Sequence, residues 1–360
     1  DGGDPGALAG VAGIPDFDQR GAPFDRTAGA DIDIGAYEWQ TLSVMVDTLD
    51  DESDGDLSQG DLSLREAIEA ANANPGADTI AFAPELADGV IRLAGALNAL
   101  VITDEVTIDG GDLGITISAD ALGDDVLVPG TTITDVAASV NAGVLGDNSR
   151  VLRLTANGAH TTLIGLTLTG GRSTGEGGAI QVSANADLTL TNSTVSGNST
   201  TGYAARGGGI YARGAVTLTN STVSGNSTTG SDASGGGIHA NGAVTLTNSM
   251  VTGNVSVNTG FDQIDASSGI TRQGGTIQGG MLRDDATTVQ SGLTAADIFA
   301  ATTEVIDGTG AGTGVFTGVL ADNGGPTATV ALLAGGQAVD TGDQTIGTPP
   351  AFDQRGNPFD

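Results

Sequence analysis

The chain of 360 residues contains no cysteine and no lysine. Without cysteine it can form neither disulfide bonds nor thiolate sites. Its 12 basic residues are all arginine and face 44 acidic residues, which gives a formal net charge of −32. A charge of this sign and size argues against nucleic acid or an anionic membrane as a partner.

Aromatic residues and long apolar runs are also scarce. Eight Phe, three Tyr and one Trp stand against 59 Gly, which is poor for a compact globule. The same composition suits a solenoid, whose core is filled by rows of small aliphatic residues and whose corners use glycine. No apolar run reaches the ~18 residues that a membrane span requires, so we expect none. No signal segment opens the chain, and we expect Asp1 to be an internal or processed start.

One phrase occurs three times between Gly177 and Asn254, in the forms GGAIQVSANADLTLTNSTVSGN, GGGIYARGAVTLTNSTVSGN and GGGIHANGAVTLTNSMVTGN. The closing asparagines follow one another at intervals of 28 residues. A fixed period of this length indicates stacked units, none of which can bury its apolar face alone. Within each copy apolar residues alternate with threonine, as Leu188 and Leu190 do, and this alternation is typical of a strand.

Superposing the copies stacks like residues on like. Ile180 falls on Ile210 and Ile238, and the segment 163–171 falls one coil below 190–198. Two columns of asparagine result: Asn192, Asn220 and Asn248, and Asn198, Asn226 and Asn254. Because Asn tolerates the left-handed conformation and hydrogen-bonds to backbone, such a column suits a corner between strands. The pattern predicts an all-β fold, a right-handed parallel β-helix with one short N-terminal capping helix.

The helix is expected over residues 63–74. Ser63 and Glu66 form a capping box, Arg65 and Glu69 are spaced as an ion pair, and the Pro-Gly at 75–76 ends the helix. We expect this helix to close one end of the solenoid, where unpaired strand edges invite aggregation.

The chain divides into four expected parts. Residues 1–40 are the tail of a preceding module, 41–77 an acidic loop with the capping helix, 78–290 a β-helix of eight or nine coils, and 291–360 a C-terminal β segment with a junction motif.

The two ends share a motif, since DFDQRGAPFD at 16–25 returns as AFDQRGNPFD at 351–360. The chain therefore looks like one module cut from a longer tandem array. Only the first copy is followed by DIGAYE, at 33–38. A solenoid end that lacks a strand exposes unpaired backbone groups, and a strand from the next unit would pair them. This predicts head-to-tail assembly, with an interface made of Asp16, Phe17, Arg20, Ile32, Ile34, Tyr37, Trp39, Phe352, Asp353, Arg355 and Phe359. The alternative is that 1–40 folds back onto its own β-helix.

The segments SLREAIEAAN with GADTIAF, NGGPTATVALL, AVDTGD and FDQRG with DIGAYE carry a family likeness. Together they resemble secreted bacterial right-handed β-helix proteins of the pectin-lyase-like superfamily, in particular those with the choice-of-anchor Q module. The pairing of GG[AG]I with VSGN is similar to the repeats of polymorphic outer-membrane adhesins, with Val where those usually have Phe. The resemblance implies a right-handed solenoid that is secreted or held at a bacterial cell surface.

An acidic loop ahead of the helix approximates a calcium-binding pattern. Carboxylates at alternate positions around a glycine can converge on one ion, and hard oxygen ligands suit Ca²⁺. Glutamate at the third position and aspartate at the twelfth depart from the usual loop, and a solvated acidic loop is the alternative. The candidate ligands are Asp50, Glu52, Asp54, Asp56 and Asp61.

We expect no catalytic residues. A polysaccharide lyase needs a carboxylate cluster beside a base, and a hydrolase needs paired carboxylates. The repeats are almost free of charge, and His160 and His239 lie about three coils apart. His239 takes the position of Gln181 and Tyr211 in the sister coils, which predicts an ordinary outward-facing side chain.

The sequence favours a structural building block of an extracellular or cell-surface fibre, made of β-helix modules joined head to tail. The alternative is an adhesin or a stalk module that binds surface glycans, which the likeness to surface adhesins and the loops 199–206 and 227–234 favour. A binding module should carry aromatic platforms on one face, and only Tyr203 and Tyr211 indicate one. A polysaccharide lyase or hydrolase is the least favoured interpretation.

Overall fold

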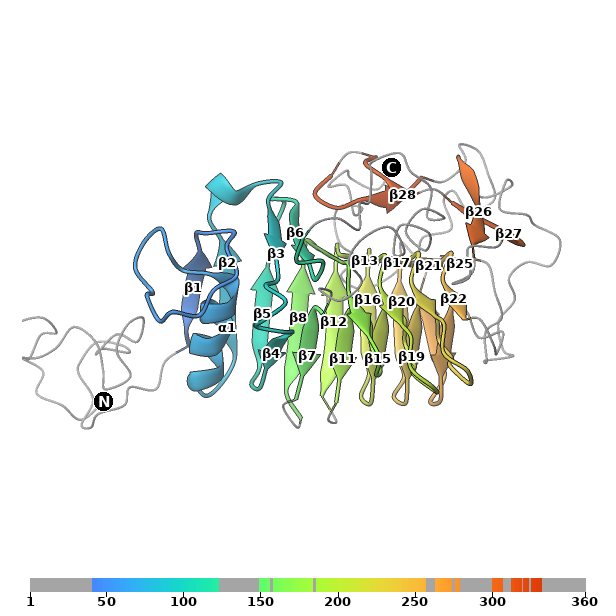
Figure 1. The fold of residues 1–360 in the computed structure, drawn as a ribbon, viewed down its shortest axis with the longest axis horizontal. Coiled ribbons are helices and arrows are strands. Elements are labelled where there is room, and N and C mark those ends of the chain that lie inside the picture. Colours follow the sequence, from blue (N-terminus) through green and yellow to red (C-terminus); the bar gives the residue numbers. More distant parts are fainter. Residues whose placement is uncertain are drawn as a thin grey trace, which may run out of the picture.

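The computed structural model describes residues 41–122, 149–155, 158–183, 186–256, 263–273, 276–278, 300–306, 312–318, 320–323 and 325–331. These residues form a parallel β-solenoid whose short strands stack along the long axis of the molecule (Figure 1). The predicted parallel β-helix is confirmed. The sense of its winding stays a prediction.

The coils contribute short strands to four parallel sheets, of which the fourth begins only at β10. Sheet 1 contains β1 (Ser43–Val46), β2 (Asp78–Phe82), β5 (Val106–Asp109), β8 (His160–Ile164), β12 (Asp187–Thr191), β16 (Val216–Thr219), β20 (Val244–Thr247) and β24 (Ile270–Gln273). Sheet 2 contains β3 (Val90–Arg92), β6 (Ile115–Ser118), β9 (Leu166–Thr169), β13 (Thr194–Ser196), β17 (Thr222–Ser224), β21 (Met250–Thr252) and β25 (Thr276–Gln278).

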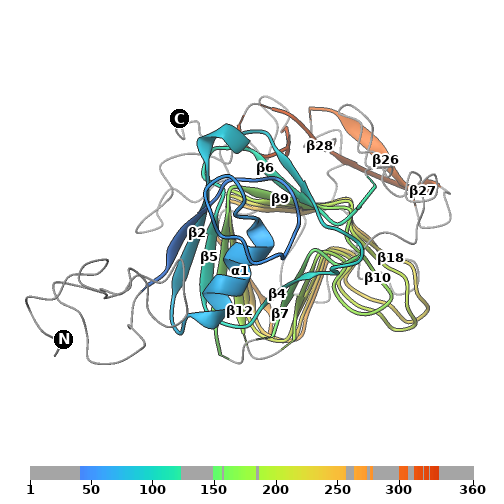
Figure 2. The same ribbon diagram turned by 60° about the vertical axis from the view of Figure 1, so that its left-hand side comes forward.

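Sheet 3 contains β4 (Leu100–Ile102), β7 (Leu152–Leu154), β11 (Ile180–Val182), β15 (Ile210–Ala212), β19 (Ile238–Ala240) and β23 (Ile264–Ala266). Sheet 4 contains β10 (Arg172–Ser173), β14 (Ser199–Thr200), β18 (Ser227–Thr228) and β22 (Val255–Ser256), which protrude as a lobe at one side of the coils (Figure 2). The loops 199–206 and 227–234 begin with two of these strands, so their first residues pair from coil to coil.

The stacking register follows the superposed repeats. Leu190 pairs with Leu218 on one side and with Leu163 on the other, and Leu218 pairs with Leu246. All four leucines are buried in one continuous aliphatic row. At the corner between sheets 1 and 2 the backbone turns through left-handed residues, with φ values of 50° at Asn192 and 47° at both Asn220 and Asn248. Asn adopts this conformation more readily than other non-glycine residues.

The solenoid begins earlier than residue 78. Strand β1 pairs in parallel with β2, so Ser43–Val46 is the first strand of sheet 1. About six turns are present, fewer than the eight or nine expected. The prediction was too high because Val106 pairs with Thr161, so the chain between them is nearly twice as long as a regular coil.

Helix α1 (Leu64–Ala73) lies across the N-terminal end of the coils (Figure 2). The predicted capping box is present, since Ser63 Oγ accepts from Glu66 N and Ser63 N donates to Glu66 Oε2, both at 3.2 Å. The apolar residues of the helix are buried against the first strands. This helix has ten residues and, in the part of the chain that the structure describes, no helix is long and apolar enough to cross a membrane.

The expected ion pair between Arg65 and Glu69 is wrong. Arg65 instead forms a two-pronged contact with Asp51, at 2.8 Å from Nε to Oδ1 and from Nη2 to Oδ2. Glu69 accepts from Ser53 Oγ at 2.9 Å. The loop before α1 folds back over the outer face of the helix, and it therefore supplies both partners.

The remaining elements are the 3₁₀ turn η1 (Pro84–Leu86) and two antiparallel pairs, β26 (Thr302–Ile306) with β27 (Gly312–Gly318) and β28 (Leu320–Ala321) with β29 (Thr329–Val330). Part of this C-terminal segment packs on its own coils. Thr194 Oγ1 donates to Ala328 O at 2.8 Å, and Thr327 Oγ1 donates to Asn192 O at 3.3 Å. Residues 327 and 328 therefore contact the corner between sheets 1 and 2 of their own chain.

Leu218→Asp is expected to destabilise the protein severely. The substitution places an unpaired carboxylate in the aliphatic row, at a side chain with 0% exposure, and we expect a loss of at least about 4 kcal/mol in unfolding free energy. Thr217→Asp is the matched control, since Thr217 points outward from the same strand and is half-exposed. Chemical denaturation measures both. Equal stability of the two variants would show that the register is off by one residue.

Candidate functional site

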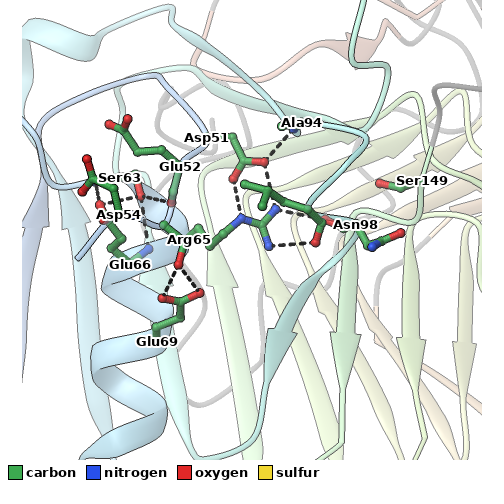
Figure 3. A network of polar contacts seen from close by, with 12 residues as sticks. Asp51, Glu52, Asp54, Ser63, Arg65, Glu66, Glu69, Ala94, Asn98 and Ser149 are labelled. Atoms are coloured by element: carbon green, nitrogen blue, oxygen red, sulfur yellow. Dashed lines mark hydrogen bonds and ion pairs between the residues drawn. The ribbon is translucent and has the colours of Figure 1, made fainter. Parts of the chain in front are cut away.

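The acidic loop is held on the outer side of α1 by the carboxylates of the helix (Figure 3). Glu66 Oε1 accepts from the backbone N–H groups of Asp54 and Gly55, at 3.1 and 3.0 Å. The same side chain closes the capping box through its other oxygen. Glu66 is only 2% exposed, so one buried carboxylate joins the loop to the start of the helix.

Three of the five proposed calcium ligands, Asp50, Asp54 and Asp56, are exposed on this loop. Asp54 and Asp56 each accept from a backbone N–H two residues on, at 2.8 and 3.0 Å. Within the described ranges, no three His, Cys, Asp or Glu side chains form a group that could hold a metal ion. Calcium binding at this loop therefore stays a prediction.

The charges of the loop nevertheless act on one another. Desolvation, followed by repulsion from Asp61 and Asp54, raises the pKa of Glu52. Desolvation, followed by repulsion from Asp54 and Asp56, raises the pKa of Asp61. Glu66 contributes to both shifts, although the sequence pattern indicated only a capping role for it. The hydroxyl and backbone N–H of Ser58, by contrast, lower the pKa of Asp56.

A second polar cluster lies on sheet 3, where the sequence predicted none. His239 Nδ1 is 3.0 Å from Asp265 Oδ2 and 3.3 Å from Ser234 Oγ, which in turn donates to Asp265 Oδ2 at 2.9 Å. The His239 ring also stacks on Tyr211, with ring centroids 5.5 Å apart. His239 is 3% exposed, so the expected ordinary outward-facing side chain is wrong.

This cluster is not arranged as a nucleophile with its base. A Ser–His–Asp triad needs the hydroxyl and the carboxylate on opposite ring nitrogens. Here both meet Nδ1, while Nε2 is buried and forms no hydrogen bond with any described residue. The cluster therefore ties β19 to β23 and to the loop that precedes β19. His160 is distant from it and contacts Thr189 Oγ1 at 2.9 Å.

The sequence held a signal for this cluster. Tyr211, His239 and Asp265 are aligned in register on β15, β19 and β23, because Ile238 pairs with Ile264. Continuing the ladder of isoleucines one coil past the third repeat places Asp265 beside His239. Tyr211 is 3% exposed, which removes it as an aromatic platform, whereas Tyr203 is 79% exposed.

The asparagine column made of Asn198, Asn226 and Asn254 is a chain of amide hydrogen bonds. Asn198 Nδ2 donates to Asn226 Oδ1, and Asn226 Nδ2 donates to Asn254 Oδ1, each at 2.9 Å. The chain ends on Gln263, whose Oε1 accepts from Asn254 Nδ2 at 2.9 Å. All four amides are buried. The superposed repeats contain the three asparagines but not Gln263, because the fourth coil no longer follows the repeat.

The residues proposed for head-to-tail assembly lie outside the described part of the chain. They are Asp16, Phe17, Arg20, Ile32, Ile34, Tyr37, Trp39, Phe352, Asp353, Arg355 and Phe359.

Comparison with protein-family models, with curated proteins and with solved structures finds no significant match of any of the three kinds.

Asp61→Asn is expected to raise the melting temperature slightly at neutral pH. The raised pKa of Asp61 means that its carboxylate is disfavoured in the folded state. The protonated Asp61 side chain therefore stabilises the folded state at a pH below the pKa that Asp61 has in the unfolded chain. This stabilisation is lost as the pH rises through the higher pKa that Asp61 has in the folded state. The gain from the substitution should vanish in acid. Melting curves from pH 3 to 7 test this, and a gain independent of pH would contradict the charge argument.

Proposed function

We propose that this protein is a structural building block of an extracellular fibre, in which β-solenoid modules are joined head to tail. The observation that carries the proposal is the parallel sheet of eight strands in sheet 1, which is in register from β1 to β24. Such a stack is a rod with a single long axis, and its two ends differ. Repeated contact between unlike ends does not close and gives a filament.

The N-terminal end offers one route for assembly. Helix α1 and the loop over it cover the core, so another solenoid cannot continue the aliphatic rows there. Strand β1 differs, because β2 is its only partner among the described strands. The carbonyls of Leu42 and Val46 accept hydrogen bonds from the backbone N–H groups of Thr79 and Ala83. Because backbone groups alternate in direction along a strand, those of Ser43 and Met45 point away from β2.

The free edge of β1 directly follows residues 1–40, which carry the DIGAYE segment. We infer that this segment and the edge of β1 meet the C-terminal end of the next unit, whether the units are separate chains or covalently linked modules. Added strands satisfy unpaired backbone groups, as in other cases of strand addition.

The proposal includes what the family resemblance implies. The motifs at the two ends resemble those of pectin-lyase-like and choice-of-anchor Q proteins, and this resemblance implies a right-handed winding, secretion and a location at a bacterial cell surface. The high net charge suits a fibre that must stay dispersed in salt water.

An adhesin that binds glycans is the second candidate, and one observation favours it. Tyr203 stands exposed on the lobe formed by sheet 4 and contacts the carboxylate of Asp232, which raises the pKa of Tyr203. A single exposed ring provides little area for a sugar. The polysaccharide lyase and hydrolase interpretations stay the least favoured, since the buried Ser–His–Asp cluster is not the pair of carboxylates that a glycoside hydrolase uses.

Assembly is tested with two changes at the N-terminal end. Deletion of residues 1–40 is expected to abolish filaments in electron micrographs while leaving the melting of the solenoid unchanged. Met45→Pro is expected to weaken assembly strongly, because proline removes a donor from the free edge without touching the bonds to β2.

Met45→Ala is the matched control and should assemble as the parent does. Filaments that persist after the deletion would sink the polymer proposal, as would a parent protein that stays monomeric at all concentrations.

Calcium is expected to stabilise the protein and to promote assembly. An ion that binds only the folded state raises its stability by mass action, and divalent ions also screen repulsion among the many carboxylates. Melting curves with calcium and with a chelator test this. Identical midpoints would remove calcium from the proposal, and a rise that survives Asp54→Ala would place the ion outside the acidic loop.

A further inference from the structure

The outer face of sheet 1 carries threonines in register from coil to coil. Strand alternation buries Leu188 and Leu190 and turns Thr189 outward, and the same holds on the neighbouring strands. We define the threonine face as two columns. One column contains Thr79, Thr107, Thr162, Thr189, Thr217, Thr245 and Thr271, and the other contains Thr191, Thr219 and Thr247.

The repeat alone does not account for the longer column. Thr79, Thr107 and Thr162 belong to strands that lie before the three perfect copies and differ from them in sequence. A solvated strand face accepts polar and charged residues of many kinds. Threonine nevertheless recurs at this register on seven consecutive strands of sheet 1, and Ser43 continues the column on β1.

The face carries few charges in a protein whose net charge is −32. Asp109 lies two residues beyond Thr107 on the same side of β5, and His160 and Asp187 lie two residues before Thr162 and Thr189. On β16 and β20 the outward positions are all threonine. Thr271 is exposed, Thr247 is buried and every other member of the face is partly exposed. A surface of this kind has little attraction for an ionic partner.

The geometry of the sheet makes these groups a regular grid. Neighbouring strands are ~4.8 Å apart and alternate residues along a strand are ~6.6 Å apart. A β-branched side chain has few rotamers in a strand, so the grid is stiff. Each hydroxyl can donate one hydrogen bond and accept two, while each methyl group restricts the orientations of the water beside it.

We propose that the threonine face binds the surface of ice, through water molecules that the grid holds in a repeating arrangement. Ice is uncharged, flat and periodic, and it offers both donors and acceptors at every oxygen. Crystalline uncharged polysaccharide shares these features, but sugar rings stack on exposed aromatic side chains and neither column contains one. This binding surface is separate from the ends of the rod that the proposed assembly uses.

The test is partition of the full-length protein into slowly growing ice, together with inhibition of ice recrystallisation. The parent should be enriched in the ice fraction relative to a globular protein of equal mass that does not bind ice. Thr217→Tyr, in the middle of the grid, should abolish the enrichment, because the ring protrudes from the plane while tyrosine remains a good strand former.

Val101→Tyr is the matched control, an exposed strand position on sheet 3, and should behave as the parent does. Circular dichroism melting checks that both variants fold. Exclusion of the parent from ice overturns the proposal, as does retention of Thr217→Tyr in the ice. Binding to microcrystalline cellulose by a parent that ice excludes would assign the face to a polysaccharide instead.

Discussion

No strand of this solenoid is stable without a neighbour one coil away, and the rest of the structure depends on that requirement. The strands contain two to five residues in the four parallel sheets, too few to persist alone in water. Stacking gives each strand apolar burial and hydrogen-bond partners. It buries Leu218 between the leucines of the neighbouring coils, and it pairs the amide of Asn226 with the asparagine amides above and below. A coil at either end has a neighbour on one side only, so the ends need other means of closure. Helix α1 closes the core at one end, and Gln263 completes the amide chain toward the other.

Much of this fold could be predicted because the repeat length is also the stacking offset. Once like residues are superposed, the pairing of Leu163 with Leu190 and the left-handed corner at Asn192 follow without further information. The predicted range missed the first strand, because β1 pairs with β2 across an intervening loop and helix and belongs to no repeat. Stacking also continues past the repeats at the other end, where β23 pairs with β19 although its coil has lost the glycines and the closing asparagine. A sequence repeat reveals only coils of equal length. Two strands can pair without such a repeat, because pairing requires only that their backbones lie side by side.

The polar contacts were harder to predict than the apolar rows, for a related reason. Carboxylates close in sequence suggested a calcium loop, yet the residue that organises the loop is Glu66, in the first turn of the helix. Arg65 has a possible partner four residues away on its own helix and pairs with Asp51, because the loop covers that side of the helix. The contact between His239 and Asp265 joins different coils. Side chains of this kind find their partners through tertiary packing, and local spacing identifies only a few of them.

The asparagine chain has a consequence for how such a protein can change in length. Asn198, Asn226 and Asn254 make the same bonds one repeat apart, so a coil inserted among them would meet the same neighbours above and below. Duplication or loss of a whole repeat would therefore alter the rod by one strand spacing, ~4.8 Å, and leave both closures untouched. An insertion inside a strand or at the asparagine corner would misplace the amide of that coil, whereas a loop between strands can change in length, as the long stretch between Val106 and Thr161 shows. Variation among related chains should accordingly come in whole coils, with the helix and the glutamine as constant ends.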